Sequence, residues 1–177
     1  SSAASDVYKR QDIDSRAEHN GHGNAIAQVY NHMIMPLANE HDKETQVKWG
    51  ITDFETRFGR KPEGIWLAET AVDDDTLRVC EANGIKFTIL SPYQALKIRK
   101  EGSNDWQDVS WGNIDPARSY RYYIKSAPGK FIDLFFYDGA ISQSVAFDEL
   151  LKDGNRFIKR LKEGISDVRD YPQLVHI

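Results

Sequence analysis

From residue 24 onward, short apolar runs alternate with helix-like segments, and this alternation limits the folds open to the chain. The apolar runs at 25–30, 64–69 and 85–90 have the length of buried strands. The segments 43–58 and 73–83, which separate them, carry helix signals. This strand–helix–strand–helix order predicts an α/β fold built on parallel strands.

Three residues mark the expected helix ends. Gly59 and Gly84 follow the two helical segments, at positions that favour a residue tolerating positive φ. Asp73 precedes the second segment and is a good N-cap, because its carboxylate can accept a hydrogen bond from the first turn. These signals indicate that both helices begin and end within the chain.

The second half of the chain continues the pattern less regularly. Residues 120–125 and 130–138 flank a Ser-Ala-Pro-Gly sequence and predict a hairpin or two adjacent strands. A helical region with one apolar face is expected from about 144 to 165, broken at 153–155. The apolar residues 174–177 predict a further strand.

The number of segments indicates part of a larger barrel. The expected strands are too few for a complete eight-stranded (β/α) barrel, which needs about 250 residues. We therefore expect residues 12–177 to form one partial barrel domain, truncated at both ends. Residues 1–11 lack periodicity and match one reading frame of a transposase adapter used in sequencing libraries, so we expect a disordered artefact there.

The composition is that of an ordinary globular protein. The 177 residues are 40% hydrophobic and carry a formal net charge of −4. Basic residues are scattered and no apolar run is long enough to span a membrane, so we expect neither a nucleic-acid nor a membrane partner. The single Cys80 argues against a disulfide framework and favours a cytoplasmic location.

Two carboxylates follow strongly apolar strands. Glu69 ends the run Ile-Trp-Leu-Ala, and Asp138 ends the run at 132–137. In α/β barrels, working residues lie where strands end, at the C-terminal face. Two carboxyl groups on one face are what glycosidic cleavage needs, with a separation of about 5 Å for retention of configuration.

Three motifs resemble glycoside hydrolase family 57, whose members act on α-glucans with retention. They are VYNHMIMPL at 29–37, GIWLAE at 64–69 and FFYDGAIS at 135–142. The similarity is greatest to bacterial members that carry an additional uncharacterised C-terminal domain. The resemblance implies an incomplete, distorted (β/α)7 barrel, an α-amylase-like or 4-α-glucanotransferase activity, and no cofactor or metal.

The resemblance also assigns roles. It implies Glu69 as the nucleophile, Asp138 as the general acid/base, and His32 at the rim of the active site. Trp66, beside the nucleophile, and Tyr137, where family members often have Arg, are expected to contact an oligo- or polysaccharide. A further departure is Gln143, where family members often have a second Asp.

The polar loop at 101–119 adds Trp106 and Trp111, whose rings are suited to stacking on a sugar; Trp111 is the expected contact. His19 and His22 have a spacing that could suggest metal ligands, but polar loops rich in Gly and Asn carry such His pairs by chance, so no metal site is expected there.

Two other functions fit parts of the pattern. A metal-dependent polysaccharide deacetylase has a related barrel, but it needs an Asp and two His around one ion, and the chain has no helix-spaced His pair. A non-catalytic carbohydrate-binding relic would keep the aromatic residues without needing both carboxylates.

Overall fold

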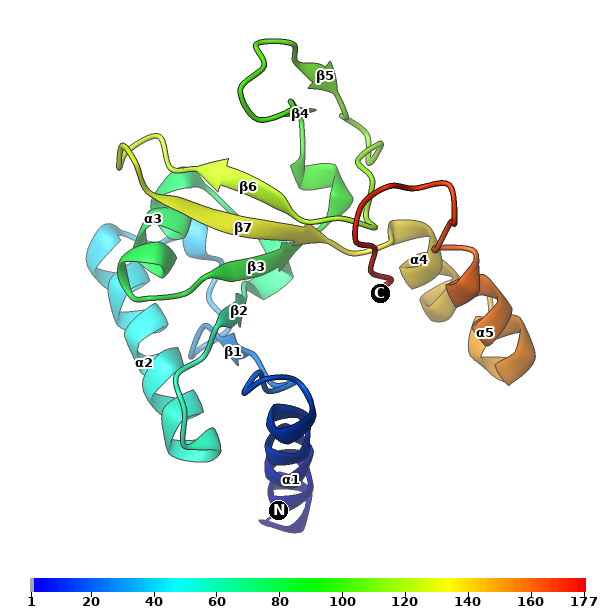
Figure 1. Cartoon of the computed structure of the whole chain (residues 1–177). Helices are drawn as coiled ribbons and strands as arrows, with labels where there is room; N and C mark the ends of the chain where they lie inside the picture. Colours follow the sequence, from blue (N-terminus) through cyan, green and yellow to red (C-terminus); the bar gives the residue numbers. More distant parts are fainter. Residues whose placement is uncertain (1) are drawn as a thin grey trace. The chain divides into compact units, whose positions relative to one another are not determined.

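The computed structural model describes residues 2–177, with side chains from Asp6 onward (Figure 1). The helices are α1 Ser2–Glu18, α2 Glu40–Phe58, α3 Asp74–Ala82, α4 Gly139–Phe147 and α5 Gly154–Lys162. Short 3-10 turns are η1 Met35–Leu37, η2 Ala68–Thr70, η3 Pro92–Gln94 and η4 Leu150–Lys152. Within the described residues, no helix is long and apolar enough to cross a membrane.

The strands form two sheets. They are β1 Ala27–Gln28, β2 Gly64–Trp66, β3 Phe87–Leu90, β4 Lys97–Ile98, β5 Gln107–Asp108, β6 Tyr120–Tyr123 and β7 Phe131–Phe136. The larger sheet has the order β1-β2-β3-β7-β6, and β4 pairs antiparallel with β5 in the smaller one. β1, β2 and β3 pair in parallel, with Ala27 opposite Ile65 and Gly64 opposite Phe87. The predicted α/β class is confirmed.

The chain divides into two compact units. The first comprises the chain up to Thr88 together with Tyr123–Ile132, and the second comprises Ile89–Tyr122 and Asp133–Ile177. The first unit therefore holds β1, β2, α2 and α3, and the second holds β4, β5, α4 and α5. The prediction of one domain over 12–177 stays a prediction.

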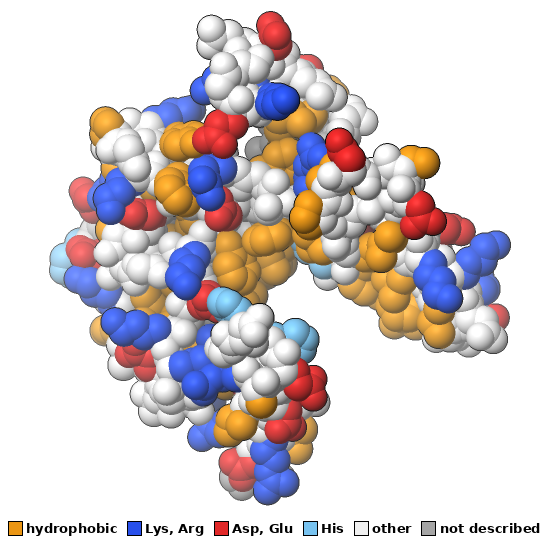
Figure 2. Space-filling model, in the orientation of Figure 1, with side chains coloured by type: hydrophobic (Ala, Val, Ile, Leu, Met, Phe, Trp, Pro, Cys, Tyr) orange, Lys and Arg blue, Asp and Glu red, His pale blue; other side chains and the backbone are white. Residues whose placement is uncertain are grey.

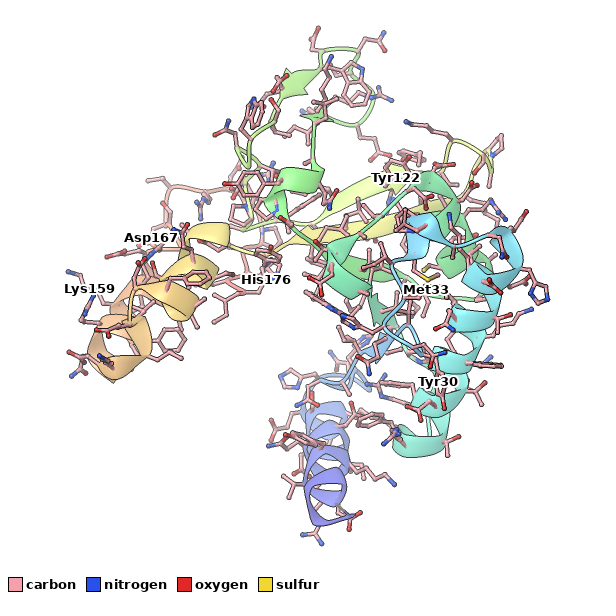
Figure 3. All side chains as sticks on the ribbon, turned by 180° about the vertical axis from the view of Figure 1, so that it is seen from behind. Tyr30, Met33, Tyr122, Lys159, Asp167 and His176 are labelled. Atoms are coloured by element: carbon pink, nitrogen blue, oxygen red, sulfur yellow. The ribbon has the colours of Figure 1, made fainter. Side chains whose placement is uncertain are left out.

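In the first unit, α2 lies against β1. A Cβ on Gly50 would lie 2.1 Å from the carbonyl oxygen of Gln28, so only glycine lets the helix approach the strand this closely. The Tyr30 ring lies beside α2 and meets Trp49 edge-on, with ring centroids 5.6 Å apart (Figure 3). The predicted C-terminus of this helix is confirmed, since Gly59 has φ 66° and donates its N–H to the Glu55 carbonyl.

The start of α3 also matches the prediction. Asp73 is the N-cap, and its Oδ1 accepts the Thr76 N–H at 2.8 Å. Its Oδ2 accepts from the Lys43 ammonium of α2 at 2.7 Å. Because the Lys43 side chain is buried, Asp73 both begins one helix and neutralises a buried charge on another.

The N-terminal segment differs from its prediction. We expected residues 1–11 to be disordered, whereas α1 begins at Ser2 and runs through them to Glu18. Two Ala residues and the run Lys9-Arg10-Gln11 occur there, and these residue types favour helix. At its other end the helix is held by Asp12, which is paired with Arg60. The adapter origin of the segment stays a prediction.

The C-terminal part of the second unit also departs from expectation. α4 begins at Gly139, five residues before the predicted start, because Asp138 caps it. No strand forms at 174–177, which was expected to be one. Phe147, Leu151 and Ile158, expected on one apolar face, are exposed, and Figure 2 shows hydrophobic side chains along this helical segment.

Candidate functional site

Glu69 follows the most deeply buried strand of the first unit. Ile65, Leu67 and Ala68 are buried, whereas the Glu69 side chain is exposed at the end of this run. The backbone turns sharply here, with φ 53° at both Glu69 and Thr70. Left-handed conformations at residues with side chains cost of order 1–3 kcal/mol each and are concentrated at functional sites. The turn therefore holds the carboxylate where a regular strand would not.

His32 contacts this carboxylate. Its Nε2 lies 3.2 Å from Glu69 Oε1, although the two residues are 37 apart in sequence. The parallel pairing of β1 with β2 explains this contact. Gln28 lies opposite Trp66, and the segments that follow the two strands leave the sheet at the same end. His32 also has φ 52°, so both partners are held by left-handed backbone. An Nε2–H that donates to Glu69 Oε1 would orient the carboxylate.

Trp66 is half-buried at the end of β2, and its carbonyl accepts the Val29 N–H at 3.4 Å. It lies three residues before Glu69. The hydrogen bond to its carbonyl fixes the backbone that leads into the left-handed turn at Glu69. Its expected contact with substrate stays a prediction.

Asp138 belongs to the second unit and follows β7. Its side chain is only 17% exposed, and its Oδ1 accepts the Ile141 N–H at 2.9 Å as the N-cap of α4. The Asp138 N–H donates to the His176 carbonyl at 3.0 Å, and Figure 3 shows His176 near this end of β7. The carboxylate is therefore held in a fixed position.

A cation faces Asp138 from α5. Arg160 Nη2 lies 3.8 Å from Asp138 Oδ1, with both side chains largely covered. The sequence has no local signal for this pair, because the two residues are 22 apart and lie on different helical segments. The preceding Tyr137, expected to contact substrate, is half-buried and donates its N–H to the Leu90 carbonyl at 3.2 Å.

The remaining candidates lie elsewhere. Trp111 is highly exposed in the loop that follows β5, within the second unit. His22 Nδ1 lies 2.8 Å from Glu63 Oε2, and Glu63 also accepts from Lys86 at 2.7 Å. Between residues 2 and 177, no group of three or more His, Cys, Asp or Glu side chains is arranged to hold a metal ion.

The family model of glycosyl hydrolase family 57 matches residues 13–176 of the chain. No curated protein matches the sequence.

Solved structures of three enzymes share the fold. The 4-α-glucanotransferase of Thermococcus litoralis is 16% identical with a TM-score of 0.63, covering 97% of this chain and 23% of its own. An exo-type maltose-forming amylase from Pyrococcus sp. ST04 is 22% identical with a TM-score of 0.64, and the match covers 93% of this chain and 26% of the amylase. A family 57 branching enzyme from Thermococcus kodakaraensis is 16% identical with a TM-score of 0.51, and the match covers 77% of this chain and 27% of the branching enzyme. The chain thus spans about a quarter of each enzyme, and the predicted incomplete barrel fold is confirmed.

Proposed function

This chain belongs to glycosyl hydrolase family 57, and on that premise we propose that it is part of a retaining enzyme acting on α-glucans. The reaction is hydrolysis or 4-α-glucan transfer, depending on whether water or a sugar hydroxyl is the acceptor. The observation that carries the proposal is Glu69, an exposed carboxylate held by strained backbone at the end of a buried strand, with His32 against it. The glucanotransferase and amylase folds support the same substrate class.

Glu69 acts as the nucleophile in the first step. Its ionised carboxylate attacks the anomeric carbon, the bond to the leaving oxygen breaks, and a covalent glycosyl-enzyme forms. The His32 imidazole positions this carboxylate through the 3.2 Å contact. Trp66, three residues earlier, is assigned a sugar contact beside the nucleophile.

Asp138 transfers the proton in both steps. As an acid it protonates the leaving oxygen, and as a base it then takes a proton from the incoming water or hydroxyl. Oδ1 caps α4 and faces Arg160, so we assign the proton transfer to Oδ2. Tyr137, adjacent in sequence, is assigned a substrate contact on this side.

Covalent trapping in the full-length protein tests the nucleophile. A fluorinated glycosyl fluoride that accumulates the glycosyl-enzyme should label the tryptic peptide 61–78, and fragmentation should place the sugar on Glu69. Glu63 lies in the same peptide, paired with Lys86, and serves as the internal control. Labelling of Glu63, or of no residue in a protein that hydrolyses glucan, would contradict the assignment.

Variants test the pair. Glu69→Gln should lower kcat on maltoheptaose by about 10³-fold or more. Asp138→Asn keeps an oxygen that can cap α4, so it should lower kcat by about 10²–10⁴-fold without loss of folding. External azide should restore turnover to Asp138→Ala if the residue is the acid/base. If the full-length protein and Glu69→Gln bound glucan equally well and neither turned it over, a non-catalytic carbohydrate-binding role would be favoured instead.

A further inference from the structure

Trp111 lies in a hydrogen-bonded turn of the second unit. It is 85% exposed, and its φ of 62° is left-handed. The Asn113 side-chain amide donates to the Ser110 carbonyl at 2.7 Å, and the Ser110 N–H donates to Asp108 Oδ1 at 2.9 Å. The adjacent Val109 is buried. An indole exposed to this degree contributes little to the core and is available for contact with another molecule.

Tyr93 supplies a second ring at the same place. A Cβ built on Gly112 would lie 3.4 Å from Tyr93 Cζ, within van der Waals contact, so the Tyr93 ring lies beside the turn that carries Trp111. Tyr93 is nevertheless 71% exposed. Its backbone is fixed by η3, where the Ser91 side chain accepts the Tyr93 N–H. Two exposed aromatic residues are thus held on neighbouring, well-anchored segments.

This pair is continuous with the segment that carries Asp138. A Cβ on Gly139, the residue after Asp138, would lie 3.2 Å from the Cγ of Pro92, the residue before Tyr93. The Tyr137 N–H also donates to the Leu90 carbonyl, which fixes the end of β7 beside the segment leading into η3. All of these contacts lie within the second unit.

We propose that Tyr93 and Trp111 form an aromatic platform that binds an α-glucan chain extending from the bond on which Asp138 acts. Pyranose rings present apolar C–H faces and polar edges. The faces can stack on the Tyr and Trp rings, while the hydroxyl groups at the edges stay hydrated. The inference rests on the proposed function, because the glucosidic bond on which Asp138 acts fixes where the bound glucan begins. A platform of this kind favours long substrates over short ones.

Trp106 provides a matched control in the same segment. It is also exposed, but the Arg99 guanidinium lies 5.1 Å from the centre of its ring. A cation over the indole occupies a face that a sugar would need. Trp106 is therefore not assigned to the platform.

The test is binding to the full-length protein carrying Glu69→Gln, which isolates affinity from turnover. Calorimetry with maltoheptaose and maltotriose gives Kd for this protein and for versions that also carry Trp111→Ala, Tyr93→Ala or Trp106→Ala. We expect the first two to weaken maltoheptaose binding about five- to tenfold, and maltotriose binding less. Trp106→Ala should match its parent, and thermal unfolding should show that all variants are folded.

The outcomes separate the platform from the proposed function. Unchanged maltoheptaose affinity in Trp111→Ala and Tyr93→Ala would overturn the platform, as would equal losses in Trp106→Ala or no maltoheptaose binding at all. If the losses occur as expected while the protein with Glu69 intact turns over no glucan, the platform stands and the proposed reaction fails.

Discussion

Replacing Asp12 by Ala should detach α1 from the first unit. The Asp12 side chain is 1% exposed and that of Arg60 is 11% exposed. Arg60 donates to Asp12 Oδ2 through Nε at 2.9 Å and to Oδ1 through Nη2 at 2.6 Å, and the Ala25 N–H donates to Oδ1 at 3.0 Å. Removing one member of a buried, hydrogen-bonded ion pair costs about 3–5 kcal/mol, because the other charge stays buried without its counter-ion.

The measurement is urea unfolding together with amide hydrogen exchange. If the free energy of local unfolding of α1 falls by about 3 kcal/mol, the amide hydrogens of residues 12–25 should exchange about 10²-fold faster. Asp14→Ala is the matched control, since Asp14 is exposed on the same helix and should change stability by no more than about 0.5 kcal/mol. An effect of Asp12→Ala below about 1 kcal/mol, or equal to that of Asp14→Ala, would refute the reasoning.

The same pair makes stability depend on pH. The hydrogen bonds from Arg60 hold the pKa of Asp12 below its ordinary value of 3.8, against the opposing effect of burial. The folded state therefore binds this proton more weakly than the unfolded chain. The contribution is fully present above about pH 4 and is lost as pH falls through the lowered pKa. The stability difference between the native protein and Asp12→Asn should accordingly shrink below that pH.

Two further changes test the core of the first unit. Asp73→Ala removes the N-cap that accepts the Thr76 N–H and leaves the buried Lys43 ammonium unpaired, so urea unfolding should show a loss of about 2–3 kcal/mol; the neighbouring exposed Asp75→Ala should cost about 0.5 kcal/mol or less. Burial raises the pKa of Cys80 to about 12, so a thiol reagent should modify it only in denaturant; rapid modification of the folded protein at pH 8 would contradict this packing.

Local signals were sufficient for the elements with clear ends. The end of α2 at Gly59 and the start of α3 at Asp73 depend on hydrogen bonds within one turn, so the sequence alone predicted them. α4 was predicted to start too late because Asp138 was assigned to chemistry, whereas its carboxylate also caps the helix. The same Asp can serve as an N-cap and as the proposed acid/base, and the sequence around it does not distinguish these two roles.

Contacts between distant residues were predictable only in part. The sequence placed His32 and Glu69 after separate strands without predicting a contact, and they meet because β1 and β2 are neighbours in the sheet. The pairing of Arg160 with Asp138 depends on how α5 folds back in the second unit, and no periodicity encodes that. The strand expected at 174–177 did not form, although the Leu174 N–H still donates to the Ala117 carbonyl. An apolar run favours a strand, but pairing requires neighbours along its length.

The left-handed turn at Glu69 and Thr70 carries a backbone strain that could be relieved at a single position. Thr70 is buried and β-branched, and its φ of 53° is one that glycine adopts without strain. Thr70→Gly therefore relieves strain while loosening the turn that aims the carboxylate. If Glu69 is the nucleophile proposed above, a selection for turnover would keep a residue at position 70 that holds this turn, even where glycine would relieve its backbone strain.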